Sequence, residues 1–149
     1  MNQDDNRFPH LTVAAIVHRE QRFLIVEELE SGRAVFNQPA GHVECGETLQ
    51  AAIVRETLEE TGWEIDLEAL LGSTSYFSPA NSVHYYRTTF IASAAVQRYS
   101  TPPDASIRAV HWFTVDQLRA ESDKMRSPLV LRTIERYLQG VRYPLDYLY

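Results

Sequence analysis

Three glutamates near the middle of the chain, Glu56, Glu59 and Glu60, have the spacing i, i+3 and i+4. In a helix this spacing places their Cβ atoms about 5–6 Å apart on one side. Gly62 predicts the helix end, so the carboxylates lie in the last turn, where the helix dipole is already negative. Each such charge costs about 0.3–1 kcal/mol there, before any mutual repulsion. The cluster therefore predicts a bound cation, and we interpret it as a divalent metal site.

A helix that positions these carboxylates is predicted from the residues around them. Thr48 can cap its start, and we expect it to run to about Thr61. On a period of 3.6 residues, Glu56 and Glu60 continue the apolar face that contains Ile53. An apolar face that ends in charges is typical of a buried site at the open end of a packed helix. A second apolar stripe predicts packing on the other side as well: Ala51, Val54 and Leu58.

The rest of the chain predicts strands interleaved with helices. Apolar, β-branched and aromatic runs indicate strands at residues 11–18, 22–28, 34–36, 64–67, 71–77, 84–96 and 109–113. The first two of these should form a hairpin, and an irregular loop should follow over residues 37–47. A short helix is expected from Thr114 or Asp116, and a last one from Ser127-Pro128 to Gly140. This order favours a mixed sheet with helices on both faces.

Size and charge narrow the class of protein. A chain of 149 residues fits one domain, 1–149, in which residues 1–9 are expected to be a flexible tail. The net charge of −6 argues against nucleic-acid polymers and anionic membranes as partners. The lone Cys45 excludes an internal disulfide, and the first residues lack a signal-peptide pattern. We expect a cytoplasmic protein, either monomer or homodimer, that binds a small molecule.

The glutamates belong to a longer pattern that resembles the Nudix box. Its members stand at fixed spacings over residues 41–63: Gly41, Glu47, Arg55, Glu56, Glu59, Glu60, Gly62 and the bulky apolar Trp63. Thr57 departs from the pattern, because the family usually has a bulky aliphatic residue there, and this weakens a packing contact more than the chemistry. Further runs resemble bacterial phosphatases of the same family: residues 26–28, 37–42, 126–130 and 142–145.

The resemblance implies an α/β/α sandwich with a mixed β-sheet and a hydrolase that cleaves pyrophosphate bonds with magnesium or manganese. Glu56 and Glu60 are then the best metal ligands, with Glu59 third and the Gly41 carbonyl fourth. Such an ion takes a few carboxylates and fills its other positions with water and substrate phosphates. The alternative for the glutamates is a solvated, Glu-rich helix end.

Two more charged residues of the box, Glu47 and Arg55, are implied to pair and to brace the junction between loop and helix. The alternative for them is a plain surface salt bridge, which contributes little. The general base stays open: Glu59 or Glu60 could deprotonate a metal-bound water, and so could a carboxylate outside the box. Glu44, which is not one of the fixed box positions, and Asp104 are the further candidates, although each could be an ordinary loop acid.

Four residues are candidates for substrate contacts. Arg87 could clamp a phosphate, or lie on the solvent face of its strand. Phe36 could stack on a ring, or belong to the core. Glu28 and His42 complete the set, and His42 has the alternative of hydrogen bonds within its loop. Nothing in the sequence makes Cys45 a nucleophile.

The leading functional prediction is magnesium-dependent hydrolysis of a nucleoside di- or triphosphate or another small pyrophosphate. The resemblance to bacterial phosphatases adds thiamine-precursor pyrophosphates to that class. ADP-ribose or dinucleoside-polyphosphate hydrolysis is an alternative, because the box is shared among these activities. A non-catalytic, nucleotide-binding module with the Nudix fold is a third reading, which the complete set of box carboxylates disfavours.

Overall fold

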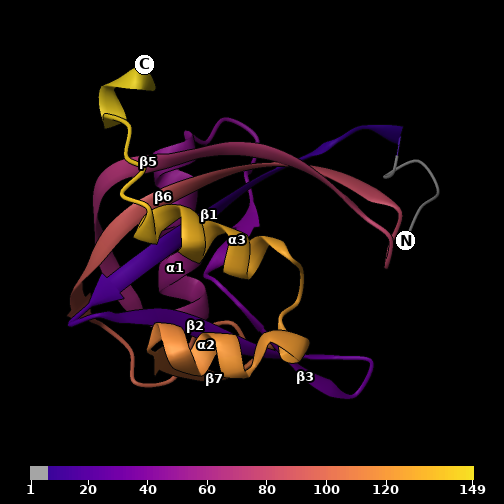
Figure 1. The fold of residues 1–149 in the computed structure, drawn as a ribbon. Coiled ribbons are helices and arrows are strands. Elements are labelled where there is room, and N and C mark those ends of the chain that lie inside the picture. The colour runs from indigo at the N-terminus through magenta and orange to yellow at the C-terminus, as the bar shows by residue number, and fades with distance from the viewer. Residues whose placement is uncertain (1–6) are drawn as a thin grey trace.

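The computed structural model describes residues 7–149, which form a mixed sheet with helices on both faces (Figure 1). Seven strands make up this sheet, with the path β3-β2-β1-β6-β5, β4 beside β1 and β7 beside β2. The strands are β1 His10–Arg19, β2 Arg22–Glu30, β3 Arg33–Asn37, β4 Ala40–His42, β5 Trp63–Ser78, β6 Val83–Gln97 and β7 Ile107–Phe113. The helices are α1 Leu49–Thr61, α2 Val115–Ala120 and α3 Leu129–Leu138, with single turns η2 Ser122–Lys124 and η3 Leu145–Tyr147.

Alternation along the central strands divides the core into two layers. Val13 and Ala15 of β1 join Ile53 of α1 in one buried cluster. Ile16 points to the other face and joins Ile134 of α3 in a second cluster. Successive side chains of a strand face opposite sides, so one strand serves both layers. The result is the expected α/β/α sandwich, and the parallel pairing of β1 with β6 makes its sheet mixed.

The expected irregular loop over residues 37–47 contains a strand, and this prediction was wrong there. β4 pairs antiparallel with β1, with Ala40 opposite Ala14 and His42 opposite Thr12. β1 pairs with β2 only near their hairpin, with Arg19 opposite Arg22. The first half of β1 is therefore available to pair with β4. A three-residue strand next to Pro39 has too little local signal to be predicted, and its partner lies far away in sequence.

The two strands expected at 64–67 and 71–77 are one continuous strand, β5, which begins directly after Gly62. Its pairing with β6 shifts register at three places, including one between Leu70 and Gly72. Such irregularities accommodate extra residues without ending a strand. The break predicted at residues 68–70 is therefore a pair of register shifts, at Leu67/Ala69 and at Leu70/Gly72, and Gly72 has φ 137°, a conformation that favours glycine.

The start and end of α1 are as predicted. Thr48 Oγ1 accepts a hydrogen bond from the Ala51 amide at 3.1 Å, and Gly62 adopts a left-handed conformation with φ 76°. The predicted second apolar stripe is confirmed only in part: Val54 packs against the core cluster and Leu58 is half-buried, but Ala51 is exposed. Thr57 is fully buried instead, and its Oγ1 donates to the Ile53 carbonyl at 2.7 Å. This internal bond satisfies the hydroxyl at the position where the Nudix pattern has an aliphatic side chain.

The last helix was expected to start at Ser127-Pro128. In the structure Pro128 is the N-cap and the helix begins one residue later, at Leu129. α2 begins after Thr114, the first of the two expected starts, with a complete capping box formed with Gln117. Residues 1–6 of the expected flexible tail lie outside the described residues, and residues 7–9 are exposed. In the described part of the chain, every helix is too short or too polar to cross a bilayer.

Candidate active site

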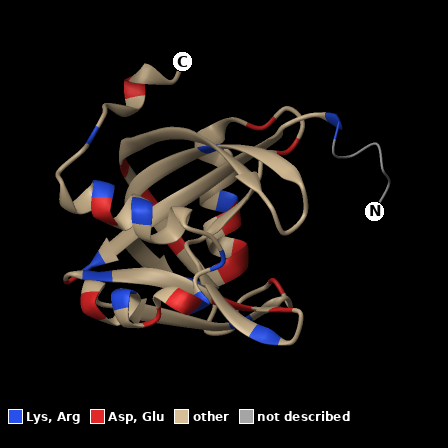
Figure 2. Ribbon diagram, turned by 45° about the vertical axis from the view of Figure 1, so that its right-hand side comes forward, with Lys and Arg blue, Asp and Glu red and all other residues tan. Residues whose placement is uncertain are grey.

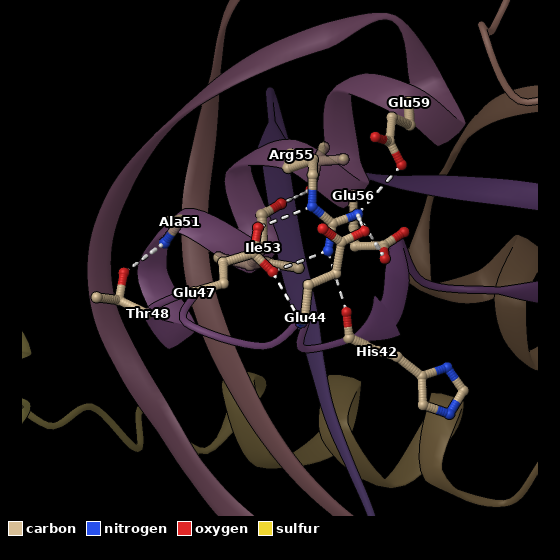
Figure 3. Close-up of polar contacts among 10 residues, drawn as sticks. His42, Glu44, Glu47, Thr48, Ala51, Ile53, Arg55, Glu56 and Glu59 are labelled. Carbon is tan, nitrogen blue, oxygen red and sulfur yellow. Dashed lines mark hydrogen bonds and ion pairs between the residues drawn. The ribbon is translucent and has the colours of Figure 1, made fainter.

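Arg55 is the centre of the polar network at the start of the box (Figure 3). Its Nε and Nη2 donate to the two carboxylate oxygens of Glu47 at 2.8 and 3.0 Å. Its Nη1 donates to Glu56 at 2.9 Å and to Glu59 at 3.2 Å, and Nη2 also reaches the His42 carbonyl at 3.0 Å. One guanidinium therefore joins the loop after β4 to two of the three glutamates of the predicted metal site.

The Arg55–Glu47 pair is more than an exposed surface contact. The side chains are 24% and 14% exposed, and the pair is bidentate. Hydrogen bonding from Arg55 lowers the pKa of the Glu47 carboxyl to about 2. The same bond raises the pKa of Arg55. The pair is therefore ionised at any physiological pH, and it holds Arg55 in position to orient Glu56 and Glu59.

Gly41 lies directly against the carboxylate of Glu56. A Cβ atom added at Gly41 would lie 2.1 Å from Glu56 Cδ, a distance that real Cβ atoms do not show. Any side chain at this position would displace the carboxylate. The absence of a side chain therefore brings the Gly41 backbone beside Glu56, as a shared metal site requires.

Glu60 is the most buried of the three glutamates, with 7% of its surface exposed. Its Oε2 accepts a hydrogen bond from the Ala40 amide of β4 at 2.9 Å. Burial raises the pKa of Glu60 well above its usual value, and the negative charges of Glu28, Glu56 and Asp104 raise it further. A buried carboxylate surrounded by other carboxylates is stabilised in its charged form by a cation.

These residues fit a hard divalent cation in their chemistry. The donors are carboxylate and backbone oxygens, which magnesium and manganese prefer. Across residues 7–149, no three His, Cys, Asp or Glu side chains already converge as a complete ligand set. Arg55 instead binds Glu56 and Glu59. Because magnesium takes few protein ligands and retains waters and substrate phosphates, a partial set of carboxylates suits it.

A cleft of about 260 Å³ opens next to the acidic cluster. Gly41 and His42 of β4 line it, as do Glu28 and Arg87. Three of the four predicted substrate residues therefore share one cavity, together with the Gly41 backbone. The cleft also has a polar and aromatic wall from the β5–β6 hairpin: Tyr76, Ser78, Asn81 and Tyr85.

Phe36, the fourth predicted substrate residue, is not part of the cleft lining. It is 6% exposed, and its ring packs edge-on against His111 and Phe113 in the core cluster beneath α2 and α3. Period-2 alternation in β3 explains this, because Asn37 faces the cleft and Phe36 faces away from it. The core reading of Phe36 is the one that the structure supports.

Arg87 is buried in the wall of the cleft rather than on a solvent face, with 7% of its surface exposed. Burial lowers the pKa of its guanidinium to about 10, so it stays protonated at neutral pH. Its Nη2 donates to Gln38 Oε1 at 2.8 Å, and its buried Nε has no hydrogen-bond partner among the described residues. No carboxylate of residues 7–149 lies within 4.0 Å of its nitrogens, so no direct ion pair neutralises this buried cation.

The sequence prediction missed Arg126, which lines the cleft, and Gln38, which is buried behind the cleft wall. The Arg126 guanidinium forms an ion pair with Glu28 at the cleft, and the Gln38 side chain supports Arg87. Both lie in runs that resemble bacterial phosphatases, residues 126–130 and 37–42, and that resemblance was the available signal.

The remaining predicted site residues lie around the carboxylates. His42 contributes its carbonyl to Arg55, and its ring Nε2 lies 2.9 Å from His10 Nδ1. Glu44 is 69% exposed and 3.8 Å from Arg55 Nη1. Asp104 donates its amide to the Glu59 carbonyl at 2.8 Å, which holds the loop after β6 against the end of α1. Cys45 is an exposed free thiol.

Comparison with known proteins decides the family. The sequence model of the NUDIX domain matches residues 8–133. The chain belongs to the Nudix family. This Nudix protein is 37% identical over 138 residues to phosphatase NudJ of Escherichia coli K12, covering 93% of the chain and 89% of NudJ. It is therefore a Nudix hydrolase that acts on pyrophosphate bonds.

Solved structures agree with the fold. A NUDIX hydrolase from Nitrosomonas europaea superimposes with a TM-score of 0.91 at 38% identity, covering 95% of this chain and 97% of that one. The NUDIX domain of Shewanella oneidensis NrtR, solved with ADP ribose, gives a TM-score of 0.69 at 19% identity and covers 94% and 93% of the two chains. The second likeness shows the fold alone.

Proposed function

We propose that this Nudix protein is a magnesium-dependent pyrophosphohydrolase, with manganese as a substitute, that acts on nucleoside di- or triphosphates or similar small pyrophosphates. The observation that supports the proposal is the placement of the acidic cluster, formed by buried Glu60 and half-buried Glu56, next to a cleft that carries Arg87. The glutamates would hold a metal cation that binds one phosphoryl group, and the Arg87 guanidinium would bind the neighbouring one. Two positive charges beside a diphosphate are what its hydrolysis requires.

In this proposal, Glu56, Glu60, Glu59 and the Gly41 carbonyl hold the metal. When bound, the ion neutralises phosphate charge and lowers the pKa of a coordinated water. Ala40 orients Glu60 through its amide, and Arg55 orients Glu56 and Glu59, which fixes the carboxylates before the substrate arrives.

Glu59 is our candidate for the proton acceptor. Its side chain is 48% exposed and accepts one long hydrogen bond from Arg55, so water can reach it. Glu60 is buried and hydrogen-bonded to the backbone, which suits a fixed ligand better than a mobile base. The alternatives are Glu44, which is not one of the fixed positions of the box, and Asp104. Replacing each of the three by glutamine or asparagine separates them, because loss of the base flattens the acid limb of the pH–rate profile.

A substrate panel tests the function. Purified protein is incubated with nucleoside di- and triphosphates, thiamine-precursor pyrophosphates, ADP-ribose and a dinucleoside polyphosphate, with magnesium or with EDTA, and released phosphate and pyrophosphate are measured. Hydrolysis of ADP-ribose or of a dinucleoside polyphosphate gives two phosphate esters and no free phosphate. Phosphatase is therefore added to these two reactions, because it releases phosphate from the products. We expect turnover of at least one small pyrophosphate that EDTA abolishes. Tight binding without turnover across the panel would instead support a non-catalytic module.

A further inference from the structure

Gln38 is a buried amide that connects α3 to the cleft wall. It is 1% exposed and lies between β3 and β4. Its Nε2 donates to the Val130 carbonyl at 2.9 Å and to Thr133 Oγ1, both on α3. An amide nitrogen has two N–H donors, so these two bonds occupy it fully. The orientation of the amide is therefore set, and its oxygen must face Arg87.

The oxygen of Gln38 accepts a hydrogen bond from Arg87 Nη2 at 2.8 Å. This partner is neutral, whereas the other arginine of the cleft, Arg126, is bound to the carboxylate of Glu28. A carboxylate partner in direct contact cancels most of the field of an arginine, whereas an amide oxygen holds the guanidinium without adding a charge. Glu60 acts on Arg87 only through space, and its negative charge raises the pKa of Arg87. The Nε of Arg87 is buried and has no hydrogen-bond partner among residues 7–149, so this part of the chain does not complete the contacts of the cation.

We propose that Gln38 is a positioning residue that fixes Arg87, which has a neutral hydrogen-bond partner in place of a carboxylate, to bind a phosphoryl group of the substrate. The inference rests on the proposed function, and it adds the element that supports substrate recognition, α3. Arg87 is more than nine-tenths buried in the cleft wall, so its guanidinium must already point in the right direction when the phosphate arrives. Gln38, which does not line the cleft, holds the guanidinium in that orientation.

The variant Gln38→Met tests this role, because methionine keeps the length of the side chain and removes both hydrogen-bonding ends. We expect KM for the best substrate of the panel to rise about tenfold, equivalent to about 1.4 kcal/mol, with kcat within about twofold of wild type. The matched control is Thr89→Val, a buried, nearly isosteric change two residues from Arg87 on the same side of β6. Its KM should stay unchanged. Equal effects in the two variants would overturn the proposal.

A double-mutant cycle separates positioning from general damage. If Gln38 acts through Arg87, the change Gln38→Met should have no further effect on KM in an Arg87→Met background. Additive increases in KM would show that Gln38 acts by another route, and the proposal would then be wrong. Thermal unfolding of all four proteins gives the separate effect on stability.

Binding of a methylene-bridged nucleoside diphosphate, measured by calorimetry with magnesium, keeps this test distinct from the test of function. If the wild type turns over no substrate, the proposed function fails, but weaker analogue binding by Gln38→Met than by Thr89→Val still supports the positioning role. If Gln38→Met does not fold, Gln38→Asn replaces it, since its shorter amide cannot span α3 and Arg87. Unchanged analogue affinity in a folded Gln38 variant would contradict the proposal.

Discussion

At the residue scale, Glu60 is in conflict with its surroundings when it is charged. Its carboxylate is buried, and three other carboxylates raise its pKa in addition to burial. The pKa of Glu60 is higher in the folded chain than in the unfolded chain. Its contribution to the free energy of unfolding is therefore largest at low pH and is lost as the pH rises through the folded pKa. A bound cation would remove this cost, which links the stability of the protein to its metal site.

Glu60→Gln should reduce turnover at least about 100-fold, because a metal ion supplies several kcal/mol to such reactions and this variant weakens its site. The fold should persist, since the glutamine oxygen can still accept from Ala40. In EDTA the variant should unfold at a higher temperature than wild type, and the difference should grow from pH 5 to pH 8. Differential scanning calorimetry and a phosphate-release assay measure the two effects. Near-normal turnover in saturating magnesium would count against the role of Glu60.

Glu47 has the opposite pH dependence. Its folded pKa of about 2 lies below the unfolded value of 4.5, so the stability it contributes is present above pH 4.5 and is lost as pH falls toward 2. Glu47→Gln should therefore flatten the decline in unfolding free energy between pH 4.5 and pH 2.5. Urea unfolding at intervals across this range measures it. An unchanged acid slope in the variant would show that the Arg55–Glu47 pair does not cause the shift.

Gly41→Ala tests the contact between the loop backbone and Glu56. The backbone of Gly41 is outside the left-handed region, so alanine is compatible with it and the effect comes from the added methyl group. That methyl group must displace the Glu56 carboxylate, and we expect magnesium to be required at about tenfold higher concentration, as when a supporting contact of a metal site is lost. Magnesium titration of activity gives the value. An unaltered titration curve would remove Glu56 from the metal site.

At the scale of elements, α1 and β4 are held separately and meet at the site. α1 has its own caps, whereas β4 depends on its pairing with β1, and the Glu60–Ala40 bond joins the two. The carboxylates lie at the C-terminal end of α1, and the Thr48 cap lies at the other end. Stability of the helix start and chemistry at the helix end should therefore be separable.

Thr48→Ala should lower the free energy of unfolding by about 1 kcal/mol, the usual value of a helix cap. We expect kcat to change less than twofold, since the first turn lies about three turns from Glu60. Urea unfolding and steady-state kinetics on the same preparation measure both. A large loss of kcat together with an unchanged unfolding curve would show that the cap acts on the site directly.

At the scale of the whole molecule, basic and acidic positions alternate along α2 and α3 and are not gathered by sign in the view of Figure 2. The net charge of −6 argues in the same direction against a nucleic-acid polymer as a partner. The cytoplasmic location, the choice between monomer and homodimer, and the single-domain boundary stay predictions.

Global stability should respond to the metal. An ion that binds the folded chain alone stabilises it by about 2.7 kcal/mol when present at 100 times its dissociation constant. Magnesium or manganese should therefore raise the unfolding temperature of the wild type above the value measured in buffer with EDTA. Glu60→Gln should show little of this increase. An equal increase in the variant would mean that the ions bind elsewhere.

The sequence by itself determined the acidic cluster and the helix that carries it, because both depend on local spacing. Glu56, Glu59 and Glu60 are neighbours through helical geometry, and Thr48 and Gly62 mark the ends through their own backbone preferences. The order of strands and helices was also sufficient for the fold class, since alternating patterns leave few ways to bury apolar faces.

The tertiary structure alone decided the composition of the cleft. Gln38 meets Val130 across 92 positions and Arg87 across 49, and no local pattern encodes such contacts. The same holds for Phe36, whose burial depends on the face that β3 presents to α2 and α3. The residues of the proposed substrate cleft are brought together by packing between distant segments, whereas the carboxylates proposed to bind the metal come from one helix and were therefore visible in the sequence.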